Sequence, residues 1–138
     1  MAYSISISQA ISIVVYIAVK MKDCNYEFLT TKAISEKLNI PVPTAVKILN
    51  SLTIAGLIVT REGAKGGVLL SKSPNDISLL DIFIAIEHER PLFKTKFDFN
   101  IGGENVTSLI NSITQCLEDS EKEMKNSLKK TTIADLLR

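Results

Sequence analysis

The chain has 138 residues, of which 46% are hydrophobic and 22% are charged, and its mean hydropathy is +0.20. This length suits one domain with an oligomerisation element attached, and the apolar content excludes an intrinsically disordered chain. Two cysteines exclude a disulfide scaffold and a four-thiolate metal site. The single histidine excludes any mechanism that needs two imidazoles from one chain.

The uncharged segment at residues 2–19 allows two interpretations, a membrane span or a buried helix. Its length approaches the roughly 17 to 25 residues that a span needs. Serines and a glutamine interrupt the segment, however, and its apolar residues recur at spacings of three and four, which is one stripe of a helix. We therefore expect a deeply buried helix. No basic region precedes the apolar stretch, so we expect no secretory signal and a cytoplasmic protein.

Charge is unevenly distributed along the chain. Residues 30–72 hold six basic and two acidic side chains, a net charge of +4. Residues 73–138 hold eight basic and eleven acidic side chains, a net charge of −3. This asymmetry predicts that the middle segment contacts a polyanion.

The basic segment contains the pattern of a helix-turn-helix. Thr30 and Thr31 are candidate N-caps for a helix over residues 32–38. Pro43 suits the first turn of a second helix, which Gly56 is placed to terminate. Two short helices joined this tightly cross steeply, as the helices of a helix-turn-helix do.

A β-hairpin is predicted directly after these two helices. Residues 57–60 are apolar and β-branched, residues 62–67 form a glycine-rich turn, and residues 68–70 are apolar again. A hairpin in this position is a wing. A capping-box variant at residues 78–81 then opens a further helix, so we expect a winged helix-turn-helix domain over residues 1–87.

The rest of the chain predicts a connecting loop and a dimerisation element. Residues 88–103 look irregular, whereas residues 105–128 predict an amphipathic helix of about 36 Å, longer than the winged domain could cover. Packing against a second copy, or less simply within the chain, would hide its stripe of Val106, Leu109, Ile110, Ile113, Leu117 and Met124. We assign residues 104–138 to dimerisation and a short final helix capped by Thr132. The expected fold class is α+β, mostly helical.

Short motifs follow one another over nearly the whole chain. They are Ala33-Ile34, Leu38-Asn39-Ile40, Lys47-Ile48-Leu49, Ala55-Gly56-Leu57-Ile58, Gly63-Ala64-Lys65-Gly66-Gly67, Pro74-Asn75-Asp76-Ile77-Ser78-Leu79 and Thr132-Ile133-Ala134-Asp135-Leu136. In this order they resemble the Rrf2 family of bacterial winged-helix transcription regulators. The resemblance implies a homodimer on a palindromic operator, with the second motif helices in successive major grooves and the wings along the minor grooves. We expect a repressor.

Residues at the start of both motif helices and on the wing are the candidate contacts to double-stranded DNA. The start of the second motif helix would meet base edges or phosphates, and the start of the first would meet a phosphate. Cations on the wing suit a narrow minor groove. The predicted contacts are Thr31, Lys32, Pro43, Thr44, Lys47, Arg61 and Lys65.

The sequence departs from the family pattern at several places, among them the wing, where Glu62 precedes Gly63, the start of the first helix and the connecting loop. Many members carry basic residues near the start of the first helix, where this chain has Ser4, Ser6 and Ser8, so we expect fewer phosphate contacts there. Cluster-binding members hold three cysteines in the connecting loop, where residues 88–103 contain none. An iron–sulfur cluster cannot be ligated as in those members, and we expect no cofactor and no metal.

The signal that the protein senses stays open. A thiol switch could use Cys24 or Cys116. A small apolar effector could lodge among aromatic rings that otherwise only anchor the loop, namely Phe83, Phe93, Phe97 and Phe99. A winged domain that docks another protein without DNA is the alternative function. We expect no enzyme, because no nucleophile–base pair, phosphate loop or metal constellation is evident.

Overall fold

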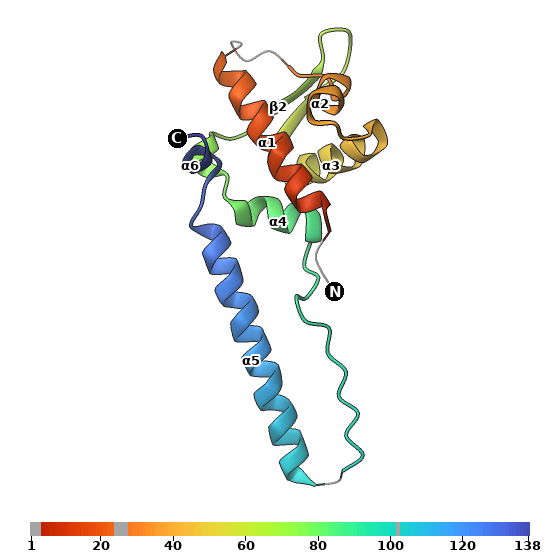
Figure 1. Cartoon of the computed structure of the whole chain (residues 1–138), viewed down its shortest axis with the longest axis vertical. Coiled ribbons are helices and arrows are strands. Elements are labelled where there is room, and N and C mark those ends of the chain that lie inside the picture. The colour runs from red at the N-terminus through yellow and green to blue at the C-terminus, as the bar shows by residue number, and fades with distance from the viewer. Residues whose placement is uncertain (1–3, 24–27, 102) are drawn as a thin grey trace.

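A head and a projecting stalk make up the chain (Figure 1), of which the computed structural model describes residues 4–23, 28–101 and 103–138. The head contains α1 (Ser6–Asp23), α2 (Thr31–Leu38), α3 (Val42–Ile54), β1 (Ile58–Arg61), β2 (Gly67–Leu70), the 3-10 helix η1 (Pro74–Asp76), α4 (Leu79–Glu87) and α6 (Ile133–Leu136). The stalk is α5 (Glu104–Lys129) together with residues 88–101. The expected α+β, mostly helical class is confirmed.

Helix α1 runs through the middle of the head. Its buried side chains recur at the predicted spacings of three and four and are Ala10, Ile13, Val14, Ile17 and Ala18. They join one apolar core with side chains from α2, α3, α4, the wing and α6. The prediction of a buried helix is confirmed, and no helix in the described ranges is long and apolar enough to span a bilayer.

The helix-turn-helix forms as its caps and prolines predict. The Thr30 hydroxyl accepts the Ala33 N–H at 3.1 Å and is the N-cap of α2, which leaves Thr31 inside the helix. Asn39 ends α2 in the left-handed conformation, with φ of 53°. Pro43 lies in the first turn of α3, and Gly56 follows its end with φ of +79°, which favours glycine.

The wing differs slightly from its predicted limits. Strand β1 begins after Leu57, because the Leu57 N–H donates to the Leu52 carbonyl in the turn that ends α3. The two strands pair antiparallel from Ile58 with Leu70 to Arg61 with Gly67. Leu29 and Val68 exchange both backbone hydrogen bonds, at 3.1 and 2.8 Å, so the segment before α2 is tied to β2.

Helix α6 returns from the stalk to the head. Thr132 and Asp135 form a capping box, and the Ile133 N–H donates to the Ile77 carbonyl at 2.8 Å. The Ile133 side chain is fully buried in the core of the head. The end of the stalk is therefore anchored beside η1.

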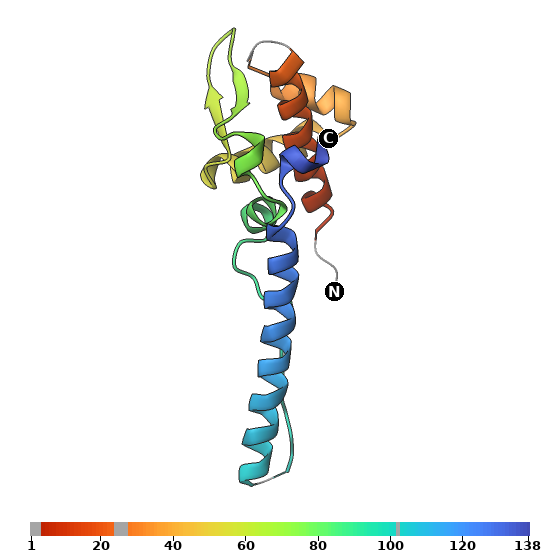
Figure 2. The same cartoon turned by 90° about the vertical axis from the view of Figure 1, so that its left-hand side faces the viewer.

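The stalk extends well beyond the head in both views (Figures 1 and 2). Residues 88–101 run alongside α5, and the Leu92 N–H donates to Glu121 Oε1 at 2.7 Å. None of the described α5 side chains is buried. The long amphipathic helix is present as predicted, and within one chain its apolar stripe is only partly covered.

Candidate nucleic-acid interface

Helix α3 presents one face to the core and the opposite face to solvent. Ala45, Ile48, Leu49 and Leu52 are buried. Spacings of four, three and four place Pro43, Lys47, Asn50 and Ile54 on the outer face, where all four are exposed. The inner face fixes the helix rigidly, so the outer face is free to enter a major groove of DNA.

The predicted contacts on α3 occupy two settings. Pro43 and Lys47 lie on the outer face, whereas Thr44 is half-buried on its flank. Sequence reasoning missed Asn50, although its position seven residues after Pro43 places it on that face. An asparagine amide can pair in a bidentate manner with adenine, so Asn50 is a candidate base-reading residue.

The start of α2 offers backbone donors and a cation. Its first turn contains no acidic residue, and Lys32 is exposed there. Thr31 is half-buried, so it contributes its backbone rather than a fully exposed hydroxyl. A helix N-terminus of this kind favours a phosphate through its N–H groups and its dipole.

The wing places its two cations differently. The Arg61 guanidinium lies 5.7 Å from the centre of the Phe28 ring, which holds the side chain back toward the segment before α2. Lys65 is exposed in the turn, next to the Gly66 N–H that donates to the Gly63 carbonyl. A hollow of about 420 Å³ is lined by Phe28, Thr30, Ala64, Lys65 and Gly66. The wing tip and the start of α2 are therefore neighbours.

The close approach of the wing to the head requires glycine at position 67. Gly67 has φ of +142°, and a Cβ atom built there would lie 2.2 Å from the Leu29 carbonyl oxygen. A side chain would break the pairing between Leu29 and Val68. Gly67 of the wing motif is thus required by the close packing of β2 against the backbone of Leu29.

The comparison with family models decides the class of the protein. The model of the Rrf2 family, described as an iron-dependent transcriptional regulator, matches residues 3–138. The chain belongs to the Rrf2 family. It is therefore a DNA-binding transcriptional regulator, and the resemblance of its short motifs to Rrf2 proteins is confirmed.

Relatives and solved structures agree with Rrf2 membership. The chain is 28% identical over 110 residues to YffB of Lactococcus lactis, assigned as an HTH-type transcriptional regulator, covering 78% of this chain and 70% of that protein. It is 40% identical over 63 residues to slr0846 of Synechocystis, with the same assignment, covering 46% of this chain and 43% of that protein.

Two solved structures share the fold. T. potens IscR matches with a TM-score of 0.68 and 24% identity, over 99% of this chain and 86% of that one. CymR of B. subtilis, the global cysteine regulator, matches with a TM-score of 0.69 and 21% identity, over 99% of this chain and 95% of that one.

The donor set of this Rrf2 chain does not fit an iron–sulfur cluster. Residues 88–103 contain no cysteine, and the two cysteines of the chain are Cys24 and Cys116. In the described ranges, no three His, Cys, Asp or Glu side chains are grouped so that they could hold a metal ion. Residues 88–103 therefore offer no thiolate that could ligate the iron of the family description.

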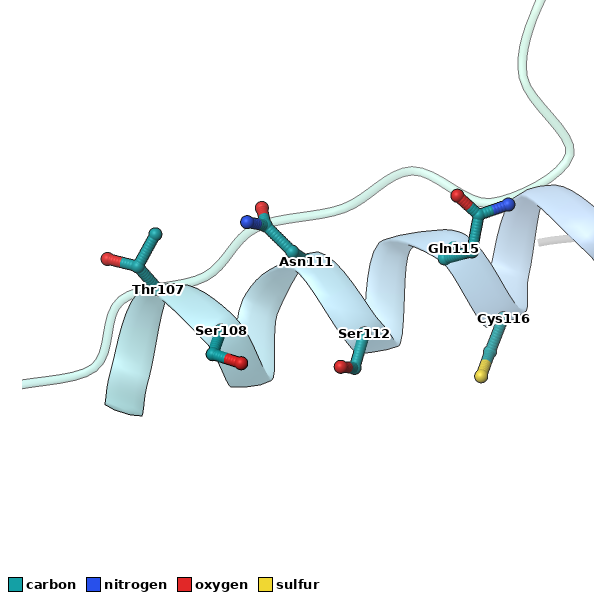
Figure 3. A pocket seen from close by; sticks show the side chains of 6 residues that line it. All are labelled: Thr107, Ser108, Asn111, Ser112, Gln115 and Cys116. Carbon is teal, nitrogen blue, oxygen red and sulfur yellow. The ribbon is translucent and has the colours of Figure 1, made fainter. Parts of the chain in front are cut away.

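The two cysteines are the candidate residues for a thiol switch. Cys24 lies outside the described residues. Cys116 is exposed on α5, and Figure 3 shows its sulfur on the same side of the helix as Ser108 and Ser112. Thr107, Asn111 and Gln115 project on another side of the same shallow hollow (Figure 3).

The four aromatic rings that could hold an effector lie in three settings. Phe83 is buried in α4. Phe93 lines a hollow of about 250 Å³ between residues 91–95 and α5. Phe97 and Phe99 stack on each other with ring centres 6.4 Å apart. Phe93, Phe97 and Phe99 thus follow the connecting segment, whereas Phe83 is buried in the head.

Proposed function

We propose that this Rrf2 regulator binds a double-stranded operator, with α3 in the major groove and the wing on the adjacent minor groove. The observation that carries this proposal is the outer face of α3, where Lys47 and Asn50 are exposed on a helix that is buried on its other side. The start of α2 and the wing tip add phosphate and minor-groove contacts through Lys32, Arg61 and Lys65.

We further propose a homodimer formed through α5. The stripe of Val106, Leu109, Ile110, Ile113, Leu117 and Met124 contains no buried member, and Leu109 is 49% exposed. A second copy would cover this stripe and set the separation of two α3 helices, which a palindromic operator requires to be about 34–36 Å or a multiple. A dimer bound across a promoter represses by excluding the polymerase.

The stalk is the route by which a signal would reach the operator. A change in the angle between two paired α5 helices would change the spacing of the two heads. Oxidation of Cys24 or Cys116, or an effector beside the rings of residues 93–99, could supply that change. A double Cys24→Ser and Cys116→Ser variant that still responds to oxidants would eliminate the thiol signal.

The test is selection of bound fragments from genomic DNA, followed by affinity measurements at several salt concentrations. We expect Lys47→Ala to weaken binding and to lower the slope of log affinity against log salt by about 0.9, the value for one lost phosphate contact. Lys122→Ala is the matched control, because this exposed lysine lies on α5. An affinity for DNA that changes neither with salt concentration nor in the Lys47→Ala variant would overturn the proposal.

Docking of a protein partner on the same helix is the second candidate function, and exposed apolar side chains on α3 favour it. Ile54 is 86% exposed, and Val42 and Val46 are also exposed. A protein partner would cover these side chains, whereas DNA would meet them only at thymine methyl groups. Ile54→Ser would then abolish partner binding while Lys47→Ala left it intact.

A further inference from the structure

A second polar hollow lies beside α3, on the flank that faces the start of α1 and the end of α4. Its volume is about 380 Å³. The polar residues that line it are Ser4, Ser6, Thr44, Lys47, Ser51, His88 and Arg90. Three segments that are far apart in the sequence thus bring a lysine, an arginine, an imidazole and four hydroxyls together.

Arg90 is held in place by a buried carboxylate. Glu87 is only 3% exposed, and its Oε2 accepts a hydrogen bond from Arg90 Nη2 at 2.8 Å. The Arg90 Nε–H donates to the Glu87 carbonyl at 3.1 Å. Among the described contacts these use two of the five guanidinium N–H groups, and the side chain is 63% exposed. The remaining donors are available to an anion.

The same carboxylate fixes the start of the chain beside Arg90. Glu87 Oε1 accepts the Ser4 N–H at 3.1 Å, and the Ser4 hydroxyl accepts the Ser6 N–H at 3.0 Å. Helix α1 has no acidic residue in its first turn. The Glu87 carboxylate offsets the positive end of this helix, so Lys47 and Arg90 supply the positive charge of the hollow, and their formal charge together with Glu87 is +1.

His88 turns the chain toward this hollow through an unusual backbone conformation. It follows α4 with φ of 57° and ψ of −139°, a region that favours glycine, and its N–H donates to the Ile84 carbonyl at 2.8 Å. This turn directs the chain so that both His88 and Arg90 line the hollow beside Lys47. Such strained positions persist where the surrounding structure holds them.

We propose that this hollow binds a backbone phosphate of the same DNA duplex that α3 contacts, with Arg90 as the principal donor. The inference rests on the proposed function, because Lys47 belongs to both surfaces. A phosphodiester placed here would receive charge-assisted hydrogen bonds from Arg90 and Lys47 and further bonds from the serine hydroxyls. The end of α4 thereby supplies the cation that the serines at the start of the first helix do not.

The first experiment compares Arg90→Gln with the wild type on a 20-bp duplex of random sequence, by fluorescence anisotropy at several salt concentrations. We expect affinity to fall about fivefold to tenfold and the salt slope to fall by about 0.9. Arg138→Gln is the matched control, because Arg138 also pairs with an acidic residue three positions earlier, at 3.5 Å from Asp135. Helix α6 and α3 lie on opposite sides of α1 (Figure 1).

A second variant separates charge from folding. Ser6→Asp places an acidic residue in the first turn of α1, which stabilises a helix, and places a negative charge in the hollow. We expect unchanged or higher thermal stability together with weaker DNA binding. Ser8→Asp is its control, because Ser8 is exposed in the same turn, its hydroxyl donates to the Ile5 carbonyl, and it does not line the hollow.

The outcomes distinguish three cases. An Arg90→Gln variant with the wild-type salt slope, or a Ser6→Asp variant that binds as Ser8→Asp does, overturns the phosphate site while α3 remains the DNA-binding element. A wild type that binds neither this duplex nor any fragment selected from genomic DNA overturns the proposed function itself. Inorganic phosphate that binds by calorimetry and is lost in Arg90→Gln, with DNA binding unchanged, assigns the hollow to a free anion and also overturns the proposal.

Discussion

In the head, the 18-residue helix α1 buries five side chains, whereas in the stalk none of the described side chains of the 26-residue helix α5 is buried. Both helices carry an apolar stripe at helical spacing. The difference lies in their neighbours, because α2, α3, α4, α6 and β2 pack around α1, while α5 contacts α4 and has residues 88–101 along one flank. A periodic stripe predicts that a helix is covered, and only the neighbours determine what covers it.

The largest expected effect tests the core of the head. Ile82→Ala removes a fully buried side chain of α4 and should lower the free energy of unfolding by about 2–5 kcal/mol. The matched control is Ile84→Ala in the same helix, where the side chain is 42% exposed and the loss should be under about 1 kcal/mol. Urea unfolding measures both, and equal losses would refute the burial difference.

The next effect tests the stalk. Ile110→Glu places a charge in the apolar stripe of α5 and should raise the dissociation constant of the proposed dimer at least about tenfold, because an unpaired charge would be buried in the contact. Asn111→Glu introduces the same charge on another side of the helix and should leave the dimer intact. Sedimentation velocity measures both.

The head should remain folded in either stalk variant, since its core contains no α5 side chain. A wild-type chain that sediments as a monomer at every concentration would remove the proposed dimer. An Asn111→Glu variant that dissociates as readily as Ile110→Glu would move the contact to another face of α5.

The smallest effect lies where the stalk rejoins the head. The Thr132 backbone N–H and then its hydroxyl, with a further contribution from Arg138, lower the pKa of Asp135 below its ordinary value of 3.8. A carboxyl whose pKa is lower in the folded state than in the unfolded state stabilises the fold above pH 3.8. This contribution is lost as the pH falls through the pKa of the folded state.

Asp135→Asn should therefore reduce thermal stability slightly near neutral pH, and its difference from the wild type should shrink below pH 3.8. The change is small because Asp135 is exposed and solvent screens its interactions. Melting curves from neutral to acidic pH provide the measurement. A difference that grows toward acidic pH would contradict the lowered pKa.

Local signals in the sequence predicted most of the elements. Thr30, Pro43 and the capping boxes at Ser78 and Thr132 act within a few residues, so their effects are visible in the sequence. The contacts on which the candidate sites depend are long-range. Nothing near Leu29 indicates that it pairs with Val68, and nothing near Ser4 indicates that Glu87 accepts its N–H.

The same limit explains what sequence reasoning missed at the site. The sequence predicts Lys47 as a contact because it lies near the start of a predicted helix. Arg90 follows α4 instead, and only the tertiary fold brings it beside Lys47. Helical periodicity predicts that Asn50 shares a face with Pro43. Asn50 is uncharged, however, so the distribution of charge does not identify it as a DNA contact. Phe83 and Phe93 are ten residues apart, but Phe83 is a buried residue of α4, whereas Phe93 lines a hollow beside α5.

The return of α6 to the head has a consequence for synthesis. Ile133 occupies the same core as Ile17, yet the ribosome makes it only after the whole stalk. A nascent chain that has emerged as far as α4 still exposes the apolar surface that Ile133 will cover, and it completes this core only when α6 leaves the exit tunnel. Translation of the stalk therefore delays maturation of the head, which contains the helix-turn-helix.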